Sequence, residues 1–230
     1  MKLKDYQKKR HFGVTSEPSG KERSNMKSDD SLIYVIQKHR ATQLHYDFRL
    51  EWKGTLLSWA VPKGPSLDPS VKRLATQVED HPIAYATFEG VIPEGEYGGG
   101  TVMVWDSGTW EPEGAGVEAG MEKGDLKFKL HGKKLKGSWV LVRTRGFGSS
   151  TKPSWLLIKH RDQFASTEDV TAKEFRSVVS KRLLAEIARD EGGNIEKAAT
   201  GDPGGKVRRP SAKKRPRPPS VWHSKKRSRK

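Results

Sequence analysis

The side chains best suited to chemistry are gathered in the segment from His39 to Arg49. Polar and apolar residues alternate over residues 45–50, which predicts a strand whose polar face carries His45, Asp47 and Arg49. His39 precedes them by an even spacing, so the chain can bring it back beside His45. Two imidazoles and one carboxylate form a plausible ligand set for Mn²⁺, Zn²⁺ or Fe²⁺, with positions left for water and substrate. An ordinary ion pair between Asp47 and Arg49, with two surface histidines beside it, explains the same residues equally well.

A second polar cluster lies in the sequence Gln-Val-Glu-Asp-His-Pro-Ile-Ala-Tyr, which starts at position 77. Glu79, His81 and Tyr85 have the same parity, although Pro82 can break a strand between them. Beside a metal ion, His81 could bind a phosphate oxygen or protonate a leaving group, and Tyr85 could donate a hydrogen bond to the same anion. Each residue alone is better explained as a satisfied polar group near a loop. Their occurrence together with the first cluster favours a catalytic site.

Two cations between these clusters could add positive charge near a phosphoryl group, as phosphoryl transfer demands. Lys63 is held between the rigid turn residues Pro62 and Gly64, and Arg73 lies in the sequence Val-Lys-Arg-Leu. On local grounds both are more simply surface cations. The three glycines at positions 98–100 could cradle a phosphate, but no Lys-Ser or Lys-Thr follows them as in a Walker A loop. A tight turn between strands explains them better.

Short strands are the elements that must position these residues. Segments with alternating or β-branched apolar residues are separated by glycine turns, and they cover 32–37, 45–50, 101–105, 108–110, 126–130, 138–142 and 155–158. This density of turns predicts a mainly β fold, a small irregular antiparallel β-barrel or a sandwich with few short helices. The first convincing helix comes late, over residues 183–188, and Gly192 and Gly193 end it.

Length and composition place these strands within one domain and its appendages. The chain has 230 residues and no cysteine, which excludes a disulfide scaffold, a Cys-ligated zinc site and a thiol nucleophile. No apolar run approaches the roughly 18 residues that a membrane helix needs, and the charged start does not match a secretory signal. We expect a soluble protein of the cytoplasm without membrane contact. The predicted parts are a flexible lead over 1–30, a barrel core over 31–163, a short helical extension over 164–200 and a tail over 201–230.

The tail contributes most of the net charge of +16. Twelve Lys and Arg residues and one acid give residues 201–230 a charge of +11, and few large apolar side chains accompany them. We therefore predict a disordered basic tail that attracts phosphates by counterion release, with one tryptophan able to stack on a base. A merely solubilising tail is the alternative. The predicted nucleic-acid contacts are Lys213, Lys214, Arg215, Arg217, Trp222, Lys225, Lys226 and Arg227.

Longer motifs surround the polar clusters. They read Val-Ile-Gln-Lys-His from position 35, Leu-His-Tyr-Asp-Phe-Arg-Leu from 44, Ser-Trp-Ala-Val-Pro-Lys-Gly-Pro-Ser from 58, Val-Glu-Asp-His-Pro from 78 and Phe-Glu-Gly-Val-Ile-Pro-Glu-Gly-Glu-Tyr-Gly from 88. In this order they closely resemble the 3′-phosphoesterase domain of bacterial DNA ligase D, and the likeness extends from Tyr6 to Arg189. With no polymerase or ligase domain attached, we expect a stand-alone version.

The resemblance implies a manganese-dependent enzyme on a small irregular β-barrel with a groove. Members of this family trim 3′ ends at a primer–template junction: they remove a terminal ribonucleoside and then hydrolyse the remaining 3′-phosphate to a 3′-hydroxyl. The resemblance assigns the metal to His39, His45 and Asp47. It assigns the phosphate to Arg49, His81 and Tyr85, and further active-site roles to Lys63, Arg73 and Glu79.

One segment departs from the family pattern. The family typically reads Lys-Arg-Asp-Phe-x-x-Thr-x-Glu-Pro near its start, and that Asp belongs to the active site. Here Arg10 and Glu17 are retained as part of an active-site arm, but His11 stands in place of the Asp. Because an imidazole cannot do the work of a carboxylate, we expect the change to affect the diesterase step or the substrate preference and to leave the metal ligands intact.

The resulting hypothesis is an end-healing hydrolase of non-homologous end joining. Its expected partner is DNA with a 3′-ribonucleotide or 3′-phosphate at a primer–template end. We also expect Ku and a separate DNA ligase or polymerase as partners, a monomeric state, and association with a prokaryotic nucleoid. One rival is a non-catalytic DNA-end-binding scaffold that acts through the basic tail. The other is a facial-triad iron oxygenase, which the order of the two histidines before the aspartate disfavours.

Overall fold

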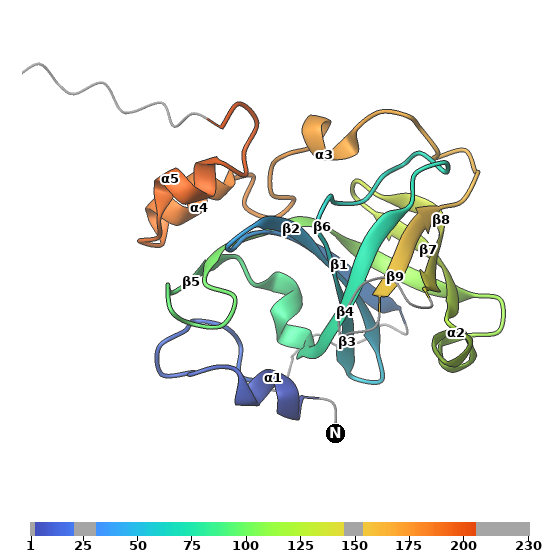
Figure 1. The fold of residues 1–230 in the computed structure, drawn as a ribbon, viewed down its shortest axis with the longest axis horizontal. Coiled ribbons are helices and arrows are strands. Elements are labelled where there is room, and N and C mark those ends of the chain that lie inside the picture. Colours follow the sequence, from blue (N-terminus) through green and yellow to red (C-terminus); the bar gives the residue numbers. More distant parts are fainter. Residues whose placement is uncertain (1–2, 21–30, 145–153, 206–230) are drawn as a thin grey trace, which may run out of the picture.

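A computed structural model of the protein describes residues 3–20, 31–144 and 154–205 (Figure 1). The eight residues predicted to bind nucleic acid lie outside the described residues, as does almost all of the predicted tail. Within the described part of the chain, none of the helices has the length and hydropathy that a membrane span requires.

Within these residues, eight antiparallel strands close into a barrel, which confirms the predicted fold class. Neighbouring strands around the barrel are β1, β2, β3, β4, β9, β8, β7 and β6, and β6 pairs back with β1. The short β5 (Gly90–Ile92) adds to the free part of β6. The barrel strands span Leu32–Arg40 (β1), Leu44–Trp52 (β2), Thr55–Val61 (β3), Arg73–Pro82 (β4), Gly100–Glu113 (β6), Asp125–Gly132 (β7), Lys136–Arg143 (β8) and Ser154–Lys159 (β9).

Two hydrophobic clusters cover opposite faces of the strands that carry the polar motif. The larger cluster contains five fully buried tryptophans together with Tyr46, Phe48 and Leu50 of β2. The second cluster packs on the other face of β1 and β6 and includes Tyr6, Tyr85 and Ile92. Since side chains alternate along β2, its odd-numbered residues face the second cluster. The polar motif is therefore built on a covered face of the sheet.

The helices are short and flank the barrel. They are α1 (Lys4–Lys8), the 3₁₀ helix η1 (Ile83–Thr87), α2 (Val117–Lys123), α3 (Val170–Lys173), α4 (Leu184–Asp190) and α5 (Ile195–Ala199). The helix predicted over residues 183–188 is α4, and it packs against α5 (Figure 1). The carboxylate of Asp202 accepts hydrogen bonds from the backbone N–H groups of Leu184 and Ala185 at 3.1 and 2.9 Å. The first residues assigned to the tail thus hold the start of α4.

The segment at residues 3–20 is packed on the barrel, although the sequence predicts a flexible lead there. Tyr6 is fully buried, and its hydroxyl donates to the carbonyl of Pro18 at 2.6 Å. The Arg10 guanidinium and the Glu17 carboxylate form a buried ion pair at 2.8 Å. The prediction failed because the segment has few apolar residues, whereas one aromatic ring and paired charges hold it in place.

Candidate active site

Three potential metal ligands meet where β1 and β2 pair at their hairpin. His39 lies directly opposite His45 in the antiparallel register, and their ring centroids are 4.7 Å apart. An oxygen of Asp47 lies 3.4 Å from Nδ1 of His39 and 3.6 Å from Nε2 of His45. Each residue offers one candidate ligand atom, and the three atoms lie within 4.8 Å of one another. Among the described residues, this group is the one cluster of His, Asp or Glu side chains that could hold a metal ion.

Backbone carbonyl groups fix which nitrogen of each histidine faces the others. Nε2 of His39 lies 2.8 Å from the carbonyl oxygen of Gly98, and Nδ1 of His45 lies 3.0 Å from that of Gln43. A carbonyl can only accept, so these two nitrogens carry the protons. The lone pairs of His39 Nδ1 and His45 Nε2 then face Asp47. Such outer partners orient metal-binding histidines, so the residues fit a metal ion before one arrives.

The surroundings keep two of the three residues, Asp47 and His39, in the forms that bind a metal ion, while they favour the protonated form of His45. Burial would raise the pKa of Asp47, but Arg49 and the two histidines outweigh it and hold that pKa well below its usual value. Burial lowers the pKa of His39, which favours the neutral imidazole. For His45, burial acts in the same direction, but the Asp47 carboxylate prevails and raises the pKa. Asp47 is therefore ionised and His39 neutral near neutral pH.

Arg49 lies on the same face as Asp47 and is held by groups that the sequence analysis did not single out. Its Nε donates to the side-chain oxygen of Gln37 at 2.8 Å, and one terminal nitrogen donates to the Ser58 hydroxyl at 2.9 Å. Its other terminal nitrogen is 3.5 Å from Asp47. Of five N–H donors, two are engaged in these hydrogen bonds, so others remain for an anion. A fixed guanidinium next to the metal ligands suits a phosphoryl group.

Gln37 is the residue that joins Arg49 to the rest of the site. It is fully buried, and its amide nitrogen donates to the carbonyls of Tyr85 and Phe88 at 2.9 and 3.0 Å. These carbonyls belong to η1 and its end, so one side chain fixes both Arg49 and the helix that carries Tyr85. Only its position in the Val-Ile-Gln-Lys-His motif marked it in the sequence.

His81 is surrounded by cations. Its Nδ1 lies 2.9 Å from the carbonyl oxygen of Glu79, so that nitrogen is protonated and Nε2 accepts from Arg10 at 3.3 Å. Burial, Arg49 and Arg10 together place the pKa of His81 well below its ordinary value. The residue is therefore neutral in this arrangement, and it is poised to accept a hydrogen bond or proton at Nε2 rather than to deliver one.

Tyr85 and the arm residues form a hydrogen-bonded layer behind this surface. The Tyr85 hydroxyl donates to Glu17 at 2.9 Å, and the same Glu17 oxygen accepts from Nε of Arg10 at 2.8 Å. Burial and the Glu17 charge raise the pKa of Tyr85 well above its usual value, so the phenol stays protonated. The Arg49 guanidinium lies 4.9 Å from the Tyr85 ring centroid, a cation–π distance. The arm thus fixes Arg10 and Tyr85 in the wall of the site.

These groups line one cavity of about 210 Å³. Glu79 lies in its wall with its carboxylate bound to Lys9 at 2.9 Å and to Arg10 at 3.4 Å. The sequence-predicted residues that line the cavity are Arg10, His39, His45, Asp47, Arg49, Glu79, His81 and Tyr85. The lining also includes residues that the predictions missed: Ala41, Ala60, Val78, Ile92, Tyr97 and Gly98.

Three sequence-predicted residues do not line this cavity. Glu17 is buried behind it and acts on Arg10 and Tyr85. Lys63 is exposed just beyond the end of β3, and Arg73 opens β4 with its Nε buried and without a hydrogen-bond partner among the described residues. The structure therefore does not bring these two cations to the metal ligands.

His11 does not line the cavity. Its side chain is 79% exposed, and Nδ1 lies 3.1 Å from a carboxylate oxygen of Glu96. An exposed pair of this kind contributes little stability. Its significance is positional, because Glu96 belongs to the loop that supplies the Gly98 carbonyl to His39.

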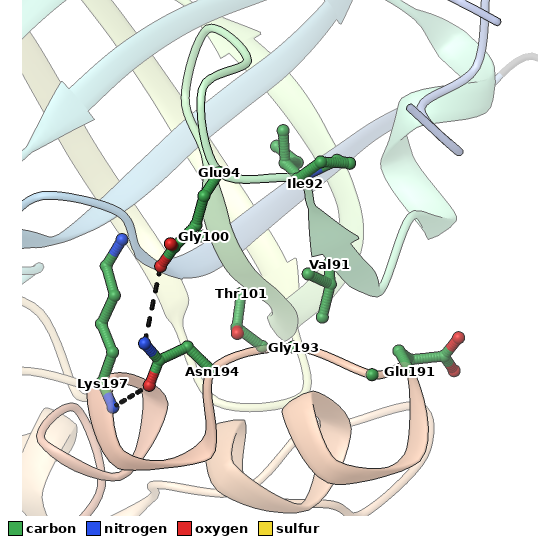
Figure 2. A pocket seen from close by; sticks show the side chains of 11 residues that line it. Val91, Ile92, Glu94, Gly100, Thr101, Glu191, Gly193, Asn194 and Lys197 are labelled. Atoms are coloured by element: carbon green, nitrogen blue, oxygen red, sulfur yellow. Dashed lines mark hydrogen bonds between the residues drawn. The ribbon is translucent and has the colours of Figure 1, made fainter. Parts of the chain in front are cut away.

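A second cavity, of about 480 Å³, lies on the other side of Ile92. It is formed where the turn between α4 and α5 faces β5 and the start of β6 (Figure 2). The Asn194 amide reaches the Glu94 carboxylate across it at 3.5 Å. Its wall carries two carboxylates, Glu94 and Glu191, and one ammonium group, Lys197, a balance that disfavours phosphate.

Residues 37–143 match the family described as the DNA ligase D 3′-phosphoesterase domain. This match confirms the resemblance predicted from the sequence. The matched range begins inside β1 and ends with β8, and it contains the three candidate metal ligands, Arg49 and His81. The arm at residues 3–20, which adds Arg10 and Glu17 to the site, lies before the matched range.

The chain is similar to proteins of several bacteria. The chain is 59% identical over 142 residues to the multifunctional non-homologous end joining protein LigD of Pseudomonas aeruginosa. It is 44% identical over 145 residues to the corresponding DNA repair protein of Mycobacterium tuberculosis, and 42% identical over 150 residues to that of Mycolicibacterium smegmatis. The matches cover 62–63% of this chain but only 17–19% of the relatives. The chain thus corresponds to one part of much longer proteins.

Proposed function

We propose that this protein is a metal-dependent phosphoesterase that heals DNA 3′ ends in non-homologous end joining. It would remove 3′-terminal ribonucleosides and hydrolyse 3′-phosphates at primer–template ends, and each reaction would leave an end closer to a 3′-hydroxyl. The observation that carries the proposal is the placement of the Arg49 guanidinium 3.5 Å from Asp47, within one cavity that also holds His39 and His45. The match to the phosphoesterase domain supports the same chemistry.

His39 Nδ1, His45 Nε2 and Asp47 would hold the metal ion, which we propose to be Mn²⁺. Two nitrogen ligands and one oxygen ligand suit manganese and are also compatible with Zn²⁺. A divalent ion at this place would polarise a phosphate oxygen and lower the pKa of a coordinated water. The carbonyls of Gly98 and Gln43 keep the two imidazoles in the tautomers that this role requires.

The protein's own side chains would bind the phosphoryl group. The remaining N–H groups of Arg49 would bind the nonbridging oxygens, with Gln37 and Ser58 preventing the guanidinium from turning away. Neutral His81 would accept a proton or hydrogen bond at Nε2 once Arg10 moves to the substrate. The Tyr85 hydroxyl would reach the same anion by exchanging its contact with Glu17.

Residues outside the cavity would have supporting roles. We propose that Lys63 and Arg73 contact phosphates of the flanking DNA, since neither lies at the metal ligands. His11 stands where the family has an aspartate, and it contacts Glu96. Because the site lacks that carboxylate, we propose that the diesterase step is the weaker of the two reactions. The ribose 2′-hydroxyl would supply the contact that distinguishes a ribonucleotide end from DNA.

The wider setting is also part of the proposal. The DNA end would be the immediate partner, and Ku with a separate ligase or polymerase would act on the same end before or after healing. The basic tail would add attraction to the DNA backbone. We place this work in the cytoplasm at the nucleoid and propose that a monomer suffices for it.

The test is an end-healing assay on purified protein. Wild type is incubated with Mn²⁺ and a primer–template that ends in one ribonucleotide, with a parallel 3′-phosphate primer and a chelator control. We expect loss of the ribonucleoside and appearance of a 3′-hydroxyl, both abolished by the chelator. His45→Ala should be inactive yet still bind DNA. His131→Ala is the matched control, because His131 pairs with Glu111 on the surface away from the cavity.

Each outcome bears on a different part of the proposal. Dephosphorylation without ribonucleoside removal would define a 3′-phosphatase and implicate His11. Full activity of His45→Ala would refute the metal site. Binding of DNA without turnover of either primer would favour a scaffold that acts through its charge.

A further inference from the structure

Tyr97 is an aromatic residue in the cavity wall that the proposed chemistry does not use. It lines the same cavity as the metal ligands, and it is nevertheless 44% exposed. The other tyrosines near the site, Tyr6 and Tyr85, are 0% and 2% exposed and serve the packing of the second hydrophobic cluster. A ring held half in solvent at the mouth of a phosphate-binding cavity stabilises the fold less than a buried one does.

The loop that carries Tyr97 is fixed relative to the metal ligands. Two successive turns are closed by hydrogen bonds from Glu96 N to Pro93 O at 3.2 Å and from Gly99 N to Glu96 O at 3.0 Å. The next residue, Gly98, supplies the carbonyl that accepts from His39 and has a φ of 82°, a conformation that favours glycine. Adjacent Cα atoms are about 3.8 Å apart. Tyr97 and His39 line the same cavity, so a nucleotide bound there can meet both side chains.

Cations from the arm surround the same ring. The Lys9 ammonium lies 4.8 Å from the ring centroid, and the Arg10 guanidinium carbon lies 5.7 Å from it. Lys9 also forms an ion pair with Glu79, and this contact holds the ammonium group near the ring. An aromatic ring with cations beside it is the combination that binds single-stranded nucleic acid, because the ring stacks on a base while the cations attract the backbone.

We propose that Tyr97 stacks on the base of the 3′-terminal nucleotide and so positions the terminal phosphodiester at the metal ligands. The inference rests on the proposed function, because it takes the DNA 3′ end as the occupant of the cavity. Every base offers a flat face, so this contact recognises that a base is present and does not read its identity.

The experiment compares binding of two labelled primer–templates that differ only at the 3′-terminal ribose, which carries a base in one and is abasic in the other. Fluorescence anisotropy is measured with a chelator present, so no turnover is needed. We expect wild type to bind the base-bearing end about 5- to 150-fold more tightly, the range that base–aromatic stacking of about 1–3 kcal/mol provides. Tyr97→Ala and Tyr97→Leu should lose this ratio, and Tyr97→Phe should keep it.

Two comparisons separate stacking from a structural role. Phe164→Ala removes another exposed aromatic, 38% accessible and outside the cavity, and should leave the ratio unchanged. Tyr97→Leu retains an apolar side chain on the loop, so its loss of the ratio with wild-type Mn²⁺ affinity would identify the ring itself. The inference is overturned if Tyr97→Leu keeps the wild-type ratio, or if wild type binds both ends equally. If the ratio depends on Tyr97 while no primer is hydrolysed, the proposed function fails and the stacking contact stands.

Discussion

Replacing Gln37 by leucine tests how the site depends on one buried amide. Gln37 accepts from the charged Arg49 and donates to two carbonyls, those of Tyr85 and Phe88. Two neutral hydrogen bonds contribute about 1 kcal/mol each and the bond to a charged donor about 2 kcal/mol. Because Gln37 is 0% exposed, water cannot replace these partners after the substitution. We therefore expect Gln37→Leu to lower the free energy of unfolding by about 4 kcal/mol.

The same substitution should impair catalysis through geometry. Without the Gln37 oxygen, Arg49 keeps the Ser58 hydroxyl and the Asp47 charge but can turn about its long side chain. A displacement of about 1 Å at a positioning group can cost on the order of 100-fold in rate, so we expect kcat/KM for 3′-phosphate hydrolysis to fall by that factor. The three candidate metal ligands are untouched, and Mn²⁺ affinity should be nearly retained.

The assay for stability is urea denaturation followed by tryptophan fluorescence, for which the chain has seven tryptophans. Gln43→Leu is the control, because Gln43 is exposed on the β1–β2 hairpin and only its backbone carbonyl contacts His45. This control should change stability by less than about 0.5 kcal/mol. A loss below about 1 kcal/mol for Gln37→Leu would refute the reasoning, because it would mean that the three hydrogen bonds are replaceable.

Two further predictions concern the barrel beside the site. Asp106 is 0% exposed, and its carboxylate accepts hydrogen bonds from the Tyr34 hydroxyl and from the backbone N–H groups of Ser107, Lys134 and Leu135. Asp106→Asn should therefore lower the free energy of unfolding in urea by about 2–3 kcal/mol. A decrease of less than about 1 kcal/mol would contradict this. Burial lowers the pKa of Lys134 from its ordinary value of 10.5 to about 8. Between these pH values the unfolded chain binds more protons than the folded one, so the contribution of this residue to stability rises with pH. The stability difference between wild type and Lys134→Met should therefore shift in favour of wild type from pH 8 to pH 10; a constant difference would disprove the effect.

The alternation of polar and apolar residues was enough to predict the parts of the site that lie on paired strands. The alternation over residues 45–50 predicted one polar face, and the hairpin register does place His39 opposite His45. Antiparallel pairing brings together residues that are close in sequence, so spacing alone carries this information.

The sequence pattern did not predict contacts between segments that lie far apart in the chain. Arg10 meets His81 across 71 positions, and the motif around Arg10 marked the residue without indicating that contact. The role of Gln37 depends on carbonyls of η1 that the sequence does not place. Tyr97 was overlooked because its glycine-rich surroundings were explained as a turn.

Some predictions failed because polar residues gave misleading signals. The strand β4 was not predicted, since its residues are mostly polar and it ends at Pro82. The roles of Lys63 and Arg73, which the resemblance places in the active site, stay a prediction, because neither residue lines the cavity. A long basic side chain fits many surroundings, so its sequence neighbours say little about which anion it meets.

The most direct test of the central claim is a crystal structure with Mn²⁺ and a short oligonucleotide that ends in a 3′-phosphate. Anomalous scattering at the manganese edge should give a peak coordinated by His39 Nδ1, His45 Nε2 and Asp47, with the terminal phosphate between that peak and the Arg49 guanidinium. A metal bound through the opposite imidazole nitrogens or at another site, or a phosphate that does not contact Arg49, would contradict the assignment of this cavity as the catalytic centre.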